Sequence, residues 1–167
     1  MSADPKAVRV QRLPGLIVHE AFSVAGFKRR FDQHTRSAIP ALWARLMGVK
    51  PFQGQEGHKA YGLTWNADHG EGAFDYMAAG RLDPSEPTPL GLERLDVPTG
   101  AYAVFRITLA GGPPHAQFAE AMRIIWGELM PASGLEVRAA PDFELYADDR
   151  PPDQAGVKVD FYVPVVA

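Results

Sequence analysis

The sequence predicts an α+β fold in which antiparallel strands and one covering helix occur twice. Both halves show the same predicted order of strand, strand, helix, strand, strand. Short similarities also relate the halves, such as Phe74-Asp75-Tyr76 and Val159-Asp160-Phe161. Residues 83–89 hold three prolines in seven positions, which is typical of a connection between structured segments. We therefore expect one domain over residues 1–167, built of two repeats at about 8–82 and 91–164.

The first repeat is predicted from turn residues and one helical stripe. Strands are expected at 8–13 and 16–27, around the turn dipeptide Pro14-Gly15. Apolar residues then recur three and four positions apart, as on one helix face: Ile39, Leu42, Trp43, Leu46 and Met47. Pro40 fits this helix if it lies in the first turn, where a missing N–H costs little. Strands at 60–65 and 72–82 follow, and the polar segment Asp68-His69 with Glu71 is interpreted as a turn in preference to a metal site.

The second repeat shows the same pattern. Strands are expected at 91–97 and 101–109, followed by a helix with Pro113 and Pro114 at its start. Its apolar stripe is Phe118, Met122, Ile125, Trp126 and Leu129, and Pro131 is expected to end it. Two closing strands complete the repeat, at 142–146 and 159–164.

The closing strands alternate apolar residues with acids and tyrosines. Neighbouring side chains of a strand point to opposite faces. We expect one set to face a helix-covered core: Phe143, Leu145, Val159, Phe161 and Val163. The other set would face away from it: Asp142, Glu144, Tyr146, Asp160 and Tyr162. Carboxylates among aromatic rings predict a ligand wall suited to a flat, apolar, cationic molecule.

Composition excludes several classes of function. The net charge of −3 and the pI of about 5.9 disfavour direct binding of nucleic acid, and Lys28-Arg29-Arg30 is interpreted as a solvated turn. The absence of cysteine excludes disulfides, thiolate zinc sites and cysteine nucleophiles. No apolar run has the length of a signal peptide or of a membrane-spanning helix. We therefore expect a cytoplasmic protein that makes no contact with a membrane.

Motifs for metals and cofactors are missing from the sequence. The five histidines, at positions 19, 34, 58, 69 and 115, show no compact ligand spacing. The glycine patterns of phosphate loops, dinucleotide folds and the hydrolase elbow do not occur. We therefore expect no metal and no cofactor.

Four segments, in order, resemble the GyrI-like small-molecule-binding family, which includes effector-binding domains of multidrug-sensing bacterial transcription activators. They are residues 98–105, 125–134, 143–146 and 159–164. The resemblance is strong from about residue 92 onward and weaker over 8–82, where Ala38-Ile39-Pro40-Ala41-Leu42-Trp43 is similar to the family's first helix. It implies duplicated SHS2-like repeats, a barrel-like fold and a central hydrophobic groove between the repeats. No helix-turn-helix segment precedes this region, so a DNA-binding step would require a separate protein.

The resemblance also implies roles for single residues. Glu144 corresponds to the family's central acid, which meets cationic ligands, and Tyr162, Tyr102 and Tyr146 fall near positions that supply aromatic walls. Trp126 lies on a core stripe and is expected to border the groove. By analogy with Asp160 and Tyr162, Asp75 and Met77 would face the groove, while Phe74 and Tyr76 pack inward. Methionine suits a surface that binds ligands of several shapes.

Three functions remain open from the sequence. The first is a small-molecule-binding protein for amphipathic, cationic or aromatic ligands, acting in transcription regulation or drug resistance. Its ligand residues would be Glu144, Tyr162, Tyr102, Trp126, Tyr146 and Met77. The second, less favoured, is a hydrolase of reactive xenobiotics, with Glu144 as general base and Tyr162 holding the leaving group. The third is a protein-interaction module that inhibits DNA gyrase.

Overall fold

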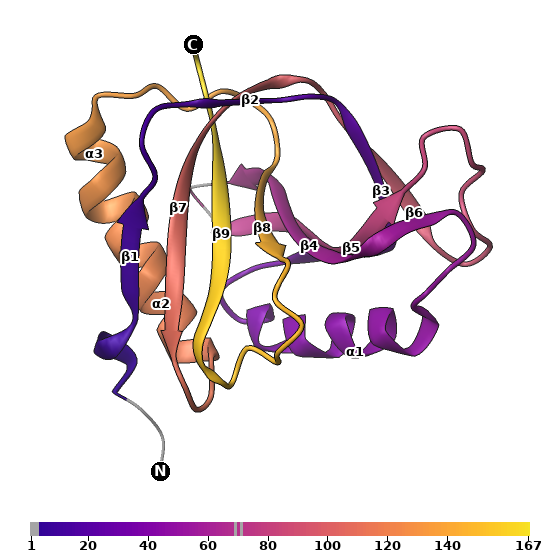
Figure 1. Ribbon diagram of the computed structural model, residues 1–167, viewed down its shortest axis with the longest axis horizontal. Coiled ribbons are helices and arrows are strands. Elements are labelled where there is room, and N and C mark those ends of the chain that lie inside the picture. Colours follow the sequence, from indigo (N-terminus) through magenta and orange to yellow (C-terminus); the bar gives the residue numbers. More distant parts are fainter. Residues whose placement is uncertain (1–3, 69, 71) are drawn as a thin grey trace. The chain divides into compact units, whose positions relative to one another are not determined.

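The computed structural model of the chain, residues 1–167, describes all positions except 1–3, 69 and 71. His69 and Glu71, which the sequence assigned to a polar turn, therefore lie outside the described residues. The first half forms β1 (Arg9–Arg12), β2 (Ile17–His19), β3 (Phe22–Phe31), α1 (Ile39–Val49), β4 (Gln55–Asp68) and β5 (Ala73–Leu82). The second half forms β6 (Glu93–Val97), β7 (Gly100–Ala110), α2 (His115–Ile124), β8 (Asp142–Tyr146) and β9 (Ala155–Val165) (Figure 1). The predicted α+β order is confirmed, with β2 as a short additional strand.

The described residues form two compact units, and neither unit is one contiguous half of the chain. Unit 1 comprises residues 1–18, 101–139 and 145–167, and unit 2 comprises 19–100 and 140–144. The repeats expected at 8–82 and 91–164 thus exchange their first strands. Strand β1 pairs with β7 of the second half, and β6 pairs with β3 of the first. Antiparallel hydrogen bonding, not proximity along the chain, decides which unit a strand joins.

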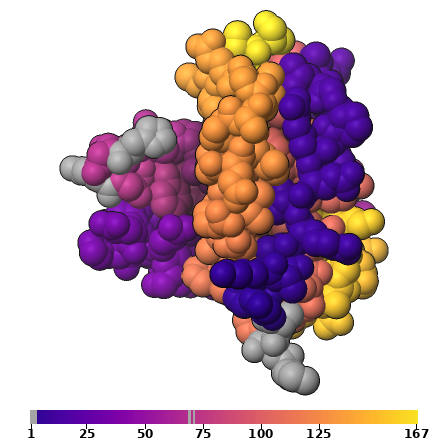
Figure 2. Space-filling view, turned by 90° about the vertical axis from the view of Figure 1, so that its left-hand side faces the viewer, coloured from indigo at the N-terminus to yellow at the C-terminus, as the bar shows by residue number. Residues whose placement is uncertain are grey.

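Unit 1 places a helix on one face of an antiparallel sheet. Strand β7 lies between β1 and β9, with partners such as Phe105 and Phe161 directly opposite each other. Every second residue of β7 and β9 enters the core, including the predicted Val159, Phe161 and Val163. Helix α2 and the following helical turns contribute Ala121, Ile125 and Met130 to that core. Figure 2 shows this helical segment, in orange, running alongside the N-terminal segment, in indigo.

The helix of unit 1 does not stop where the sequence predicted. A single π-helical turn, η3 (Ile125–Leu129), follows α2, and a last turn, α3 (Met130–Ser133), follows η3. Pro131 lies in the first turn of α3, where proline is tolerated, so the expectation that Pro131 ends the helix is wrong. The helix ends instead at Gly134, whose φ of 70° is a left-handed cap conformation favoured by glycine.

Unit 2 is a four-stranded antiparallel sheet in the order β4-β5-β3-β6, with α1 packed on one face. The side chains between helix and sheet include Phe31, Leu42, Leu46, Tyr76 and Ala78. Leu42 and Leu46 belong to the stripe predicted from the sequence, and Pro40 lies in the first turn of α1 as expected.

The sheet of each unit is open. Closing a barrel needs a full ring of tilted, staggered strands, and the three- and four-stranded orders described above do not return to their starting strands. The barrel-like part of the expected fold is therefore corrected to an open antiparallel sheet. Among the described residues, no helix is both long and apolar enough to cross a bilayer.

Candidate ligand site

Strand β8 carries the predicted central acid, Glu144. Side chains along β8 point alternately to its two faces, so the acids and the buried Phe143 lie on opposite faces. Phe143 is fully buried against Phe22 and Tyr61, with ring centroids 5.4 and 5.9 Å away. Asp142 and Glu144 flank Phe143 and point to the opposite face of the strand. Both acids are half-buried.

The acids of β8 lie on the helix-covered side of unit 2. Tyr61 pairs with Ala79, so it occupies the face opposite Ala78 and Tyr76, which pack under α1. Phe143 contacts Tyr61 and therefore belongs to the face away from α1. The expectation that Phe143 faces a helix-covered core, with the acids on the far side, is wrong for this unit. Alternation identifies which residues share a face but not which face a helix covers.

A tryptophan and a tyrosine accompany the acids on this face. The indole Nε1 of Trp43, on α1, donates a hydrogen bond of 3.0 Å to the hydroxyl of Tyr76, on β5. Gly62, on β4, makes room for that hydroxyl, because a Cβ at this position would collide with it. From the sequence, Trp43 was expected on the apolar stripe of its helix, and Tyr76 was expected to pack inward. Their hydrogen bond depends on the position of α1 over β5, which sequence periodicity does not reveal.

Electrostatics link these groups. Burial raises the pKa of Asp142 well above its ordinary value, and the neighbouring Glu144 carboxylate raises it further. Burial likewise raises the pKa of Tyr76, with added repulsion from Glu144 and a smaller contribution from Asp142, while the hydrogen bond from Trp43 opposes the shift. This poorly solvated surface thus accumulates negative potential. A bound cation would relieve it, and the partly exposed ring of Trp43, positioned by the buried Tyr76, offers aromatic surface to the same ligand.

Met77 was expected to line the site, and the structure places it elsewhere. It follows Tyr76 on β5 and points to the opposite face, where only 1% of its surface is exposed. Its neighbour Asp75 accepts a hydrogen bond from Asn66 and lies 3.4 Å from the Arg30 guanidinium. By analogy with Asp160 and Tyr162, Asp75 and Met77 were expected to face the ligand, but they lie on the other face of β5. Tyr76 is the residue of β5 that shares a face with the acids.

The predicted aromatic residues of unit 1 separate into two groups. Tyr146 packs against Phe118 on the helix-covered face, with ring centroids 6.2 Å apart. Tyr162 lies on the other face of the sheet, edge-to-face with the fully buried Tyr102 at 5.9 Å. The expectation that Tyr146 and Tyr162 share a face is therefore wrong.

Two further side chains complete the description of unit 1. Trp126 lies in the π-helical turn η3 with 38% of its surface exposed, and its ring meets Phe161 at 6.1 Å. The guanidinium of Arg138 lies 5.3 Å from the centroid of the Tyr102 ring. Helical π-turns are frequent at functional sites, and this one leaves an aromatic ring partly open to solvent.

The described residues contain no cluster of three side chains suited to hold a metal ion. What unit 2 brings together is a pair of carboxylates, an indole and a phenol. This arrangement can bind a cation.

Open antiparallel sheets, each with a helix on one face, make this chain an α+β protein. The chain belongs to the GyrI-like small molecule binding domain family, whose model matches residues 16–166.

One curated relative is similar in sequence, and two solved structures are similar in fold. The transcriptional regulator BrlR of Pseudomonas aeruginosa is 33% identical over 161 residues, which cover 94% of this chain and 57% of BrlR. The chain thus spans little more than half the length of this relative. An integron cassette protein from the mobile metagenome of Vibrio cholerae has a similar fold, with a TM-score of 0.71, 22% identity, and coverage of 96% of this chain and 99% of that one. The protein SAV2435, solved with tetraphenylphosphonium bound, gives a TM-score of 0.69 at 19% identity, with coverage of 96% and 94%.

Proposed function

We propose that this chain binds amphipathic organic cations with aromatic surface, at the acids of β8. Glu144 supplies negative charge, and Asp142 adds to it when the bound cation displaces its proton. The partly exposed ring of Trp43, held by its hydrogen bond to Tyr76, supplies aromatic surface. The observation that carries the proposal is the placement of two half-buried carboxylates on the face that holds the Trp43–Tyr76 hydrogen bond. Two neighbouring charges in a poorly solvated place are unfavourable for the protein alone, and a cation compensates for them.

The nature of the ligand is supported by a relative of the same fold. Tetraphenylphosphonium, bound in SAV2435, combines one positive charge with four phenyl rings. Such a cation cannot donate hydrogen bonds, so charge and ring contact must supply its affinity. The described face of unit 2 offers both features.

The biological role that we propose is effector binding in transcription regulation. BrlR, which this chain resembles over 57% of its length, is a transcriptional regulator. The response to a ligand would then pass to a DNA-binding part or partner. The ligand roles of Tyr102, Tyr146, Tyr162 and Trp126, the groove between the repeats and the cytoplasmic location stay predictions from the sequence. The geometry adds no observation in favour of the hydrolase or of the gyrase inhibitor.

Calorimetric titration with tetraphenylphosphonium tests the proposal. We expect Glu144→Gln to weaken binding by about thirtyfold or more, because loss of one partner from a desolvated charge pair costs at least about 2 kcal/mol. Glu136→Gln is the matched control, since Glu136 is an exposed glutamate of unit 1 and its loss changes the net charge equally. A neutral triphenyl compound should bind the parent protein and Glu144→Gln about equally. Equal affinity of the parent protein and Glu144→Gln for the cation would refute the proposal.

A further inference from the structure

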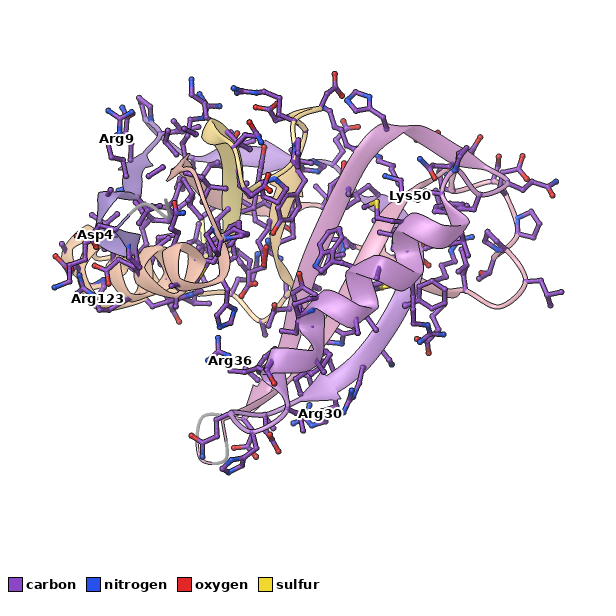
Figure 3. The ribbon with its side chains drawn as sticks, turned by 90° about the horizontal axis from the view of Figure 1, so that it is seen from below. Asp4, Arg9, Arg30, Arg36, Lys50 and Arg123 are labelled. Carbon is purple, nitrogen blue, oxygen red and sulfur yellow. The ribbon has the colours of Figure 1, made fainter. Side chains whose placement is uncertain are left out.

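A second polar surface lies on unit 1, on the sheet face that α2 does not cover. On β7, Phe105 and Ile107 enter the core below α2, so Arg106 and Thr108 point to the opposite face. The strand register brings two rows of side chains across this face. One row is Arg9, Thr108 and Lys158, and the next is Gln11, Arg106 and Asp160. Figure 3 shows Arg9 projecting from β1 on the side away from α2, whereas Arg123 lies on the helix.

These rows border a cleft of about 550 Å³, a size that small-molecule sites commonly have. Its lining consists of Arg9, Val10, Gln11, Arg106, Thr108 and Lys158. Three of these side chains are basic and none is acidic, although the chain as a whole carries a net charge of −3. The cleft therefore concentrates positive charge on an otherwise acidic protein.

Arg106 is held in place by an ion pair, whereas the other two basic side chains of the cleft, Arg9 and Lys158, are not. The Nε and Nη2 of Arg106 donate hydrogen bonds of 2.9 and 3.0 Å to the two carboxylate oxygens of Asp160. This bidentate pair fixes the guanidinium plane and leaves its Nη1 group for another acceptor. Arg9 and Lys158 are exposed, and neither forms an ion pair with any residue that the structure describes. With Asp160 neutralising one of the three basic charges, two positive charges remain without a counter-ion.

The spacing of Arg9 and Lys158 suits a single anion. They flank Thr108 on the two neighbouring strands of β7, and adjacent strands lie about 4.8 Å apart. Their long side chains can therefore converge above the Thr108 hydroxyl. Two cations, a hydroxyl donor and the free Nη1 group of Arg106 can surround an oxyanion with several acceptor oxygens.

We propose that this cleft binds a small phosphate-type anion that carries at least two negative charges. A monoanion would leave one of the two surplus cations unpaired, whereas a dianion or a diphosphate group pairs both. The inference does not rest on the proposed binding of organic cations, because it concerns another unit, another sheet face and a ligand of opposite charge. It assigns the chain a second ligand, recognised through Arg9, Arg106, Thr108 and Lys158.

Titration of the full chain with pyrophosphate at low ionic strength, followed by calorimetry and by backbone amide NMR, tests this site. We expect Arg9→Gln and Lys158→Gln each to weaken binding about tenfold, the loss of one charge-assisted hydrogen bond, and the double variant about a hundredfold. Chemical shifts of the parent protein should change at the amides of Arg9, Thr108 and Lys158. Because both substituted side chains are exposed, the variants should keep the parent circular dichroism spectrum and bind tetraphenylphosphonium unchanged.

Arg12→Gln is the matched control. Arg12 is exposed on the same strand, but it pairs with Phe105 and so points to the other face. Its substitution should change pyrophosphate affinity less than twofold. Unchanged affinity in the Arg9→Gln, Lys158→Gln double variant would overturn the proposal, and so would an equal loss in Arg12→Gln, which would indicate a general effect of net charge. Citrate that binds as tightly as pyrophosphate would overturn the assignment to phosphate-type anions.

Discussion

Asp142 and Glu144 are two carboxylates on one face of a short strand, and the environment of Asp142 disfavours its charged form. Burial contributes most to this effect, and repulsion from Glu144 adds to it. Both effects favour the protonated form of Asp142 over its carboxylate form. Asp142 was noted in the sequence only as a member of the acidic face, yet its pKa is one that the fold raises.

The raised pKa of Asp142 predicts a pH dependence of stability. Above the ordinary value of 3.8, the unfolded chain releases a proton that the folded protein still holds. The stability gained from this proton is present at low pH, and it is lost as pH rises from 3.8 through the higher pKa of the folded protein. Asp142→Asn removes the titration. We therefore expect the free energy of unfolding of the variant to lose this dependence on pH. At neutral pH it should exceed that of the parent protein by on the order of 1 kcal/mol, so that the variant unfolds at higher urea concentration.

Urea denaturation between pH 4 and 8 would measure this effect, with Asp153→Asn as the control, since Asp153 is exposed. The assignment would be contradicted if the parent protein became more stable as pH rises over this range and Asp142→Asn abolished that increase. Binding of a cation should release the proton of Asp142, because positive charge lowers the pKa of a nearby carboxyl.

At the scale of elements, α1 determines what the acids face. Leu46 is fully buried and Leu42 is nearly so, and both attach the helix to Tyr76 and Ala78. Trp43 is carried on the same helix and reaches the Tyr76 hydroxyl only while α1 stays in this position. The packing of apolar side chains on α1 therefore fixes the geometry of a polar contact.

Truncation of Leu46 tests this dependence. We expect Leu46→Ala to lower the free energy of unfolding by about 2–5 kcal/mol, because it leaves a cavity under α1. The affinity for tetraphenylphosphonium should also fall, since Trp43 loses its fixed position. Met47→Ala is the control, because Met47 is the next residue of the same helix and 55% exposed, so its truncation should cost less than about 0.5 kcal/mol. Chemical denaturation and titration of both variants measure the two effects, and similar losses would contradict the assigned packing.

The elements themselves were largely predictable. Hydrophobic spacing identified α1 and α2, and turn residues separated the strands, because both signals arise between near neighbours in the chain. The π-helical turn after α2 and the continuation past Pro131 were not predictable in this way. A proline is compatible with a first helical turn as well as with a helix end, and only the surrounding packing distinguishes the two.

At the scale of the whole molecule, the exchange of first strands ties each compact unit to both halves of the chain. Strand β1 finds its partner in β7, and β6 finds its partner in β3. Each unit therefore contains pairings between residues far apart in sequence. Such pairings require long loops to close before the contacts form, which slows folding.

The stability of fragments of the chain should follow the compact units and not the sequence repeats. Residues 19–100 keep all four strands of the unit 2 sheet together with α1, whereas residues 1–90 lack β6 and leave β1 without β7. We expect 19–100 to unfold cooperatively. Fragment 1–90 should be less stable by about 2 kcal/mol or more, because it loses the burial of Val97 and its pairing with Phe22. Thermal unfolding followed by circular dichroism compares them, and a more stable 1–90 fragment would show that the repeats are the folding units.

The sequence by itself determined the local patterns of this protein: the helical stripes, the alternation along β8 and β9, and the presence of two acids among aromatic residues. Tertiary structure decided which strand pairs with which, and on which face of the unit 2 sheet α1 lies. Alternation is fixed by backbone geometry, so Asp142 and Glu144 must share a side whatever the fold. Whether that side meets a helix depends on contacts between distant segments, and for that reason Tyr76 and Trp43, and not Met77, accompany the acids.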